Sequence, residues 1–132
     1  MIGLDTNVLV RYLTQDDEMQ SAAAGRLIES FEPIAPGFVS LVTLVETMWV
    51  LDRSYRLDRE RLGSIVDGLL TSKELVLDRA EDVVRALRLY RRGNADFSDC
   101  LIFSISERCG CEATMTFDAR AARTASMTLL AS

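Results

Sequence analysis

Hydrophobic positions change along the chain between short continuous runs and longer stretches with helical spacing. The short runs predict strands at residues 2–4, 38–40, 75–77, 113–117 and 127–130. Apolar side chains that recur every three or four positions predict helices at residues 8–13, 19–31, 41–53, 57–70, 80–92, 99–108 and 119–123. Strands that alternate with helices indicate an α/β fold, here a three-layer α/β/α sandwich with a mostly parallel central sheet.

Polar residues and glycine mark the ends of several predicted helices. Asp58 and Asp78 stand at the positions of N-caps, and Gly93 follows the last residue of the helix at 80–92. The helix at 99–108 is apolar on almost every side, so we expect it to be buried nearly all round.

Composition predicts one globular domain over residues 1–132. The chain is 48% hydrophobic and 27% charged, and no apolar stretch is long enough to cross a membrane. The predicted core begins at residue 2, which leaves no room for a signal peptide, so we expect a cytoplasmic protein with reduced cysteines. The net charge of −5 differs from the basic footprint of most nucleic-acid-binding proteins, although nearly all the basic residues are arginines, which bind phosphate well.

Two scarce residue types limit the chemistry. The chain has no histidine, which excludes Ser-His and Cys-His nucleophile pairs and histidine metal sites. The only lysine, Lys73, lies in a polar turn, which argues against Schiff-base and P-loop chemistry. Carboxylates, arginines, hydroxyls and bound metal remain.

Asp5 and Asp118 each stand at the end of a predicted strand, where ligands bind in open α/β sheets. Each could instead cap the helix that follows it, although Thr6 and Asn7 could serve as that cap in place of Asp5. Strand alternation places Thr116 on the same side as Asp118, so that its hydroxyl could join a site there.

Glu46 lies among hydrophobic residues of the helix at 41–53, where an unpaired buried carboxylate is costly. Two arrangements remain open. If Ser40 is the N-cap, Glu46 lies in the second turn and faces the core or a cleft. If the helix begins at Thr43, then Thr43 and Glu46 form a capping box.

Asp96 and Asp99 stand at the start of the helix at 99–108. Asp96 fits the N-cap position, and Asp99 fits the first turn, where the helix dipole favours anions. Of the two, we take Asp99 as the inward ligand and Asp96 as a supporting or capping group.

The four acids Asp5, Glu46, Asp99 and Asp118 therefore lie where they can converge at one edge of a parallel sheet. Carboxylates gathered so closely repel one another unless cations neutralise them. Oxygen ligands without His or Cys favour Mg²⁺, with Mn²⁺ as a plausible substitute. One or two such ions can generate a hydroxide nucleophile and stabilise the leaving oxygen of a phosphodiester displacement.

Four motifs resemble PIN-domain proteins and, among them, the VapC-type toxin ribonucleases of toxin–antitoxin pairs. They are Leu4-Asp5-Thr6-Asn7-Val8-Leu9, Val45-Glu46, Ala95-Asp96-Phe97-Ser98-Asp99-Cys100-Leu101-Ile102 and Thr116-Phe117-Asp118. The resemblance spans nearly the whole chain. It implies a compact α/β/α sandwich and a Mg²⁺-dependent endoribonuclease, usually a homodimer that a cognate antitoxin inhibits. It also implies that Asp5, Glu46 and Asp99 are the core acids and Asp118 the more variable fourth.

Arginines and apolar side chains beside these motifs allow two interpretations each. Arg88, Arg91 and Arg92 either stabilise the C-terminus of their helix or contact RNA phosphates. The helices at 41–55 and 59–70 either bury their apolar faces in the core or leave a groove for an antitoxin helix.

The individual apolar residues of the helix at 41–53 are most simply assigned to the core. We expect this of Met48, Trp49 and Leu51.

Other functions fit fewer features. A haloacid-dehalogenase-like phosphatase would have a second Asp where this chain has Asn7, and both it and a response-regulator receiver would use a lysine that Lys73 is badly placed to supply. DNA flap nucleases are longer and carry more acids. The alternative is a non-toxin PIN-domain nuclease or a catalytically silent RNA-binding PIN-like module, and a silent module is expected to lose acids that this chain keeps.

Overall fold

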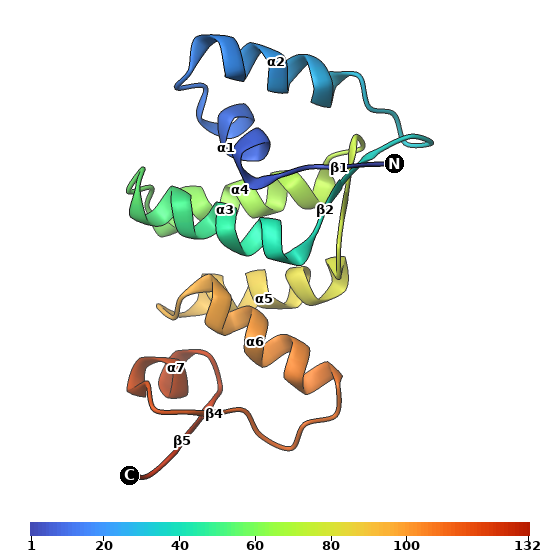
Figure 1. The fold of residues 1–132 in the computed structure, drawn as a ribbon. Helices are drawn as coiled ribbons and strands as arrows, with labels where there is room; N and C mark the ends of the chain where they lie inside the picture. The colour runs from blue at the N-terminus through green and yellow to red at the C-terminus, as the bar shows by residue number, and fades with distance from the viewer. The chain divides into compact units, whose positions relative to one another are not determined.

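The computed structural model describes residues 1–132, which form two compact units, Met1–Asp78 and Arg79–Ser132. Each unit contains its own parallel sheet with helices beside it (Figure 1). None of the helices combines the length and the apolar content that crossing a membrane requires.

The first unit is built around a three-stranded parallel sheet in the order β1-β2-β3. Its elements are β1 (Ile2–Gly3), α1 (Thr6–Thr14), α2 (Glu18–Glu29), β2 (Gly37–Val39), α3 (Leu41–Arg53), α4 (Arg59–Thr71) and β3 (Leu75–Leu77). In Figure 1 the α1–α2 pair lies above β1 and the α3–α4 pair lies below it. The core of this unit is apolar, with Leu9, Val39 and Leu51 fully buried, so burial of these faces holds the helices against the strands.

The second unit begins with two helices that pack side by side, α5 (Ala80–Arg92) and α6 (Phe97–Arg108). Strands β4 (Met115–Thr116) and β5 (Thr128–Leu129) pair in parallel on either side of α7 (Ala119–Thr124) in the chain. Val83, Ala86 and Cys100 are fully buried, and the rings of Tyr90 and Phe97 meet edge to face with centroids 5.7 Å apart.

The predicted α/β fold class is confirmed, because helices alternate with strands and every strand pairing inside the named sheets is parallel. The bounds of α3, α5 and β3 agree with the prediction residue for residue. Helix α6 begins at Phe97, two residues earlier than predicted. That the chain is a single domain remains a prediction.

The predicted helix ends are partly right. Asp58 caps α4 as expected, since its Oδ1 accepts the Arg61 N–H at 2.8 Å. The cap role predicted for Asp78 is wrong, because the N-cap residue of α5 is Arg79 and Asp78 instead accepts the N–H of Leu41 at 3.2 Å. The carboxylate after β3 therefore satisfies the first turn of α3, a partner distant in sequence.

Gly93 does end α5, but its backbone is extended and not left-handed. Glycine is required here for a different reason, because a Cβ atom at this position would lie 2.8 Å from Cβ of Thr124. Close approach of the chain after α7 therefore explains the glycine.

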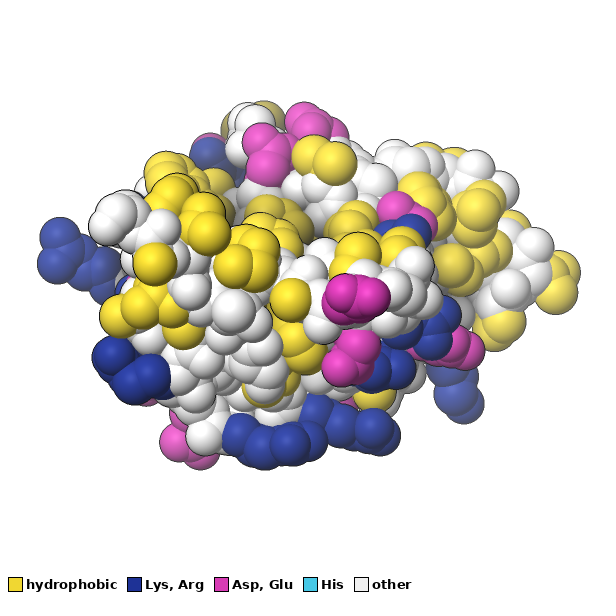
Figure 2. Space-filling view, turned by 90° about the horizontal axis from the view of Figure 1, so that it is seen from below, with side chains coloured by type: hydrophobic (Ala, Val, Ile, Leu, Met, Phe, Trp, Pro, Cys, Tyr) yellow, Lys and Arg dark blue, Asp and Glu magenta, His cyan; other side chains and the backbone are white.

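Two predictions of burial are wrong. Helix α6 is not buried all round, since Ile102 is half exposed while Cys100 and Leu101 are buried. Trp49 is 58% exposed, with the guanidinium of Arg53 over its ring at 5.1 Å, whereas Met48 and Leu51 lie in the core as expected. Figure 2 shows hydrophobic side chains at the surface of one face, where Lys and Arg side chains gather along one margin.

Candidate active site

Asp5 is separated from β1 only by the buried Leu4, and it occupies the N-cap position of α1. Its side chain makes no capping hydrogen bond and is exposed. The carboxylate of Asp5 therefore does not cap the helix, and its oxygens are available to a ligand.

Thr6 joins the start of α1 to α3. The Thr6 side chain is buried, and its hydroxyl donates a hydrogen bond of 2.7 Å to Oε1 of Glu46, forty residues further along the chain. Glu46 lies in the second turn of α3 and is exposed, so of the two expected surroundings, the core or a cleft, the core is excluded. The supporting role predicted for Thr6 has a physical basis here, because a charge-assisted hydrogen bond restricts the carboxylate of Glu46.

The start of α3 decides between the two arrangements left open for Glu46. Ser40 is the N-cap, and its Oγ accepts the N–H of Thr43 at 3.1 Å, so the capping box of Thr43 and Glu46 is wrong. The hydroxyl of Thr43 instead donates to the carbonyl oxygen of Leu4 at 3.2 Å. Thr43 thus fixes α3 against the residue that precedes Asp5, a contact between distant segments that neighbouring residues do not reveal.

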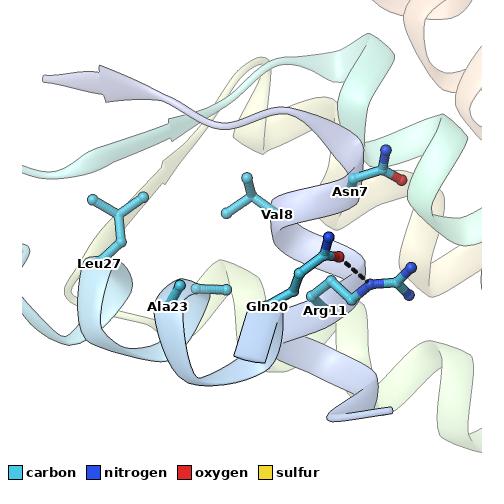
Figure 3. Close-up of a pocket in the computed structure, with 7 residues that line it drawn as sticks. Asn7, Val8, Arg11, Gln20, Ala23 and Leu27 are labelled. Carbon is cyan, nitrogen blue, oxygen red and sulfur yellow. Dashed lines mark hydrogen bonds between the residues drawn. The ribbon is translucent and has the colours of Figure 1, made fainter. Parts of the chain in front are cut away.

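Asn7, a predicted supporting residue, is exposed and takes no part in the hydrogen bond between Thr6 and Glu46. It lines a hollow of about 440 Å³ between α1 and α2 (Figure 3). The other residues of its lining are Val8, Arg11, Gln20, Ala23, Ala24 and Leu27. Arg11 donates from Nε to Oε1 of Gln20 at 2.8 Å at one side of the hollow. No carboxylate lines this space, so it carries none of the acid chemistry.

Three predicted acids lie in the second unit. Asp96 occupies the N-cap position of α6 without a side-chain capping bond, and Asp99 lies in the first turn of α6, partly buried. Asp118 caps α7, since its Oδ1 accepts the N–H of Arg120 at 2.8 Å. Thr116 supports that turn, because its hydroxyl oxygen accepts the N–H of Asp118 at 3.0 Å.

These three acids act on one another electrostatically. Burial raises the pKa of Asp99 above its ordinary value, and the negative charges of Asp96 and then Asp118 raise it further. Arg120 opposes this shift in the pKa of Asp99, and its Nη2 lies 4.0 Å from Oδ1 of Asp96. Arg120 was not among the residues predicted from the sequence, although its position two residues after Asp118 could have indicated that it lies near the acids.

The donors available for a metal ion are divided between the units. Asp5 and Glu46 belong to the first unit, and Asp99 and Asp118 belong to the second. Neither unit alone contains a group of three or more Asp, Glu, Cys or His side chains close enough to hold a metal ion. The donor set still fits a hard divalent cation, because it consists of carboxylates. Burial is the main cause of the raised pKa of Asp99, and the negative charges of Asp96 and Asp118, which a cation would neutralise, add to it.

The three arginines predicted near the acids differ in their surroundings. Arg88 and Arg92 line a hollow formed by residues of the second unit, together with Arg85 and Ser104. Arg91 is exposed and does not line this hollow.

Comparison with known proteins identifies the family. The model of the PIN domain family matches residues 2–127. This chain belongs to the PIN domain family. It is also similar to the VapC ribonuclease of Aquifex aeolicus (strain VF5), with 23% identity over 117 residues, which cover 89% of this chain and 87% of that protein. The predicted PIN membership is confirmed, and both findings support a nuclease of the VapC type.

Proposed function

We propose that this protein is a Mg²⁺-dependent endoribonuclease toxin. The observation that carries this proposal is the PIN match over residues 2–127, which contains Asp5, Glu46, Asp99 and Asp118. Similarity to a protein named VapC ribonuclease supports RNA as the substrate. The absence of histidine agrees with this chemistry, because carboxylates are then the main side chains able to bind metal and move protons.

The four acids act together on one phosphodiester in this proposal. Asp5, Glu46, Asp99 and Asp118 would hold Mg²⁺, for which Mn²⁺ could substitute, and the ion would supply charge stabilisation at the phosphate and a more acidic bound water. Thr6 keeps Glu46 in one orientation through its 2.7 Å hydrogen bond. Asp96, Asn7 and Thr116 support their neighbours without binding the metal.

Asp99 carries a further role before the metal binds. Its raised pKa keeps a proton on this carboxyl to higher pH than usual, and this carboxyl would have to lose that proton to serve as a metal ligand. The partly buried position of Asp99 also restricts its contact with water, which strengthens its interaction with a cation.

RNA cleavage in the presence of Mg²⁺, and separately Mn²⁺, tests the proposal. We expect wild-type protein to cut RNA, EDTA to stop cleavage, and Asp5→Ala and Glu46→Gln to abolish it while each variant remains folded. Asp52→Asn is the matched control for Glu46→Gln, because Asp52 is an exposed acid of the same helix without an assigned role.

Two results would contradict the proposal. Equal cleavage by wild type and Asp5→Ala would indicate a contaminating nuclease and would remove the site assignment. RNA binding without cleavage by any variant, under all metal conditions, would favour the silent RNA-binding module.

A cognate antitoxin, a homodimeric state and a cytoplasmic location belong to the same proposal. Val42 and Trp49 support a protein partner, because both are more than half exposed on α3, which also carries Glu46. A partner that covers these side chains would also cover Glu46. Purification of the protein with and without the product of a neighbouring small reading frame would test the inhibition.

A further inference from the structure

A polar hollow of about 390 Å³ lies on the second unit, apart from the predicted acids. Its lining is Arg85, Arg88, Leu89, Arg92, Phe103, Ser104, Glu107 and Ser126. None of Asp96, Asp99 and Asp118 lines it. Any ligand of this hollow is therefore bound by residues other than the predicted acids.

The pattern of α5 places three arginines on one side of the helix. Arg85, Arg88 and Arg92 are spaced three and four residues apart, so their side chains project from one stripe of the helix surface. The opposite side of α5 is buried through Val83 and Leu87. The arginines must consequently remain at the surface.

Only one of these arginines is neutralised by a carboxylate of the lining. Arg85 forms an ion pair with Glu107 of α6. The side chains of Arg88 and Arg92 make no ion pair or hydrogen bond in the structure. Helix residues four positions apart have Cβ atoms about 5–6 Å apart, so the two unpaired arginine side chains start from neighbouring positions of the helix surface. Such a pair, in a protein whose net charge is −5, favours a ligand with clustered negative charge.

We propose that this hollow binds the phosphate backbone of single-stranded RNA. Arg88 and Arg92 supply guanidinium forks that match phosphate oxygens. Phe103 favours nucleic acid over a free phosphate ion, because sites for single strands combine basic side chains with an aromatic ring on which a base stacks. The hydroxyls of Ser104 and Ser126 add polar groups to the same lining. The inference rests on the proposed function, since it assigns an RNA contact outside the acids.

RNA binding measured without cleavage tests this inference. Fluorescence anisotropy would follow a labelled mixed-sequence RNA of about twelve nucleotides, in EDTA and over a range of salt concentrations. We expect the double variant Arg88→Ala/Arg92→Ala to bind about tenfold more weakly than wild type at low salt. The slope of log K against log salt should become shallower by about 0.7 for each RNA phosphate that the variant no longer neutralises.

A matched control separates this site from a general effect of charge. Arg26→Ala/Arg123→Ala removes the same charge from two exposed arginines of α2 and α7 that do not line the hollow. We expect wild-type affinity and wild-type salt slope for this control. Equal weakening by the two double variants would overturn the proposal.

Phe103→Leu distinguishes RNA from free phosphate. We expect this variant to weaken RNA binding about fivefold or more, because a stacked base is lost. Inorganic phosphate should stabilise Phe103→Leu against thermal unfolding as much as it stabilises wild type. Wild-type RNA affinity in both Phe103→Leu and Arg88→Ala/Arg92→Ala would overturn the RNA assignment, whatever inorganic phosphate does.

The experiments distinguish failure of the RNA-binding hollow from failure of the proposed nuclease function. Weaker binding by Arg88→Ala/Arg92→Ala without any cleavage by wild type would support the hollow and reject the nuclease. Metal-dependent cleavage that Asp5→Ala abolishes, with RNA affinity unchanged in Arg88→Ala/Arg92→Ala, would support the nuclease and reject the hollow.

Discussion

The hydroxyl of Thr6 donates a 2.7 Å hydrogen bond to Oε1 of Glu46 and so connects the first residue of α1 to the second turn of α3. Thr43 makes a parallel connection, since its hydroxyl donates to the carbonyl oxygen of Leu4. Two hydroxyl groups on neighbouring segments therefore fix the surroundings of Asp5 and Glu46.

Loss of the Thr6 hydroxyl should weaken metal binding. Thr6→Val keeps the shape of the side chain but leaves Glu46 without this donor, and groups that orient a metal ligand typically contribute tenfold or more to affinity. We expect the Mg²⁺ concentration for half-maximal RNA cleavage to rise about tenfold. Thr6→Ser retains the hydroxyl and should stay near wild type, so equal loss in both variants would contradict the role.

The raised pKa of Asp99 predicts how stability depends on pH in metal-free protein. Because the folded state holds this proton more tightly than the unfolded state, stability is lost as pH rises from about 4, the ordinary value, through the higher folded pKa. Asp99→Asn should lack this loss and unfold at a higher temperature than wild type near neutral pH. Thermal unfolding in EDTA at several pH values checks this, and identical profiles would contradict it.

Gly93 and Gly68 should respond in opposite ways to alanine. A Cβ at Gly93 would lie 2.8 Å from Cβ and 3.2 Å from the carbonyl oxygen of Thr124, so we expect Gly93→Ala to destabilise by about 1–3 kcal/mol. Gly68 lies inside α4 with open space around it, so Gly68→Ala should stabilise by about 0.5–1 kcal/mol. Urea unfolding of both variants measures the difference, and a neutral Gly93→Ala would show that Thr124 can move.

Asp82 and Glu81 pair with the same arginine from different environments. Asp82 is buried, with its Oδ1 2.7 Å from Nε of Arg108 and its Oδ2 3.0 Å from Nε of Arg79. The contact of Oδ1 is an ion pair without hydrogen-bond geometry. Glu81 is exposed and lies 2.8 Å from Nη1 of Arg108. We expect Asp82→Asn to cost about 2 kcal/mol, less than a fully buried pair because both arginines reach solvent.

The corresponding change at Glu81 provides the comparison. Glu81→Gln should cost less than about 1 kcal/mol, because solvent screens an exposed ion pair. Chemical unfolding of both variants tests the pair of predictions. Equal costs for Asp82→Asn and Glu81→Gln would show that burial does not decide the strength of these contacts.

Thr43 and Thr47 are buried one turn apart on α3 but should differ in their response to valine. Thr43 bonds to the carbonyl oxygen of Leu4, so Thr43→Val should destabilise by about 1 kcal/mol. The hydroxyl of Thr47 is buried without a partner, so Thr47→Val should leave stability unchanged or raise it by up to about 1 kcal/mol. A destabilised Thr47→Val would indicate an ordered water at this hydroxyl.

Sequence patterns predicted the elements better than they predicted which side chains are exposed. Both ends of helix α5 were predictable because its apolar residues recur on one face and its charges on the other. On α3 the exposed stripe contains Val42 and Trp49 beside Glu46, so hydrophobicity alone gave no sign that this acid reaches solvent.

The hydrogen bonds between distant segments were equally hidden. Asp78 follows a strand and precedes a helix, which is the pattern of a local cap, yet its partner is the N–H of Leu41. Such a pairing depends on the arrangement of β2 and β3 and not on neighbouring residues. For the same reason the sequence suggested Asp5 and Glu46 but not Thr43, which fixes α3 to Leu4.

The exposed indole of Trp49 gives the protein a built-in optical reporter. It is the only tryptophan of the chain, and it lies three residues after Glu46, on the same side of α3. Tryptophan fluorescence, excited selectively over that of the tyrosines, therefore comes from one known place, beside a predicted ligand of the metal. A cation that binds Glu46, or a partner that covers this stripe, should change that emission in unlabelled wild-type protein.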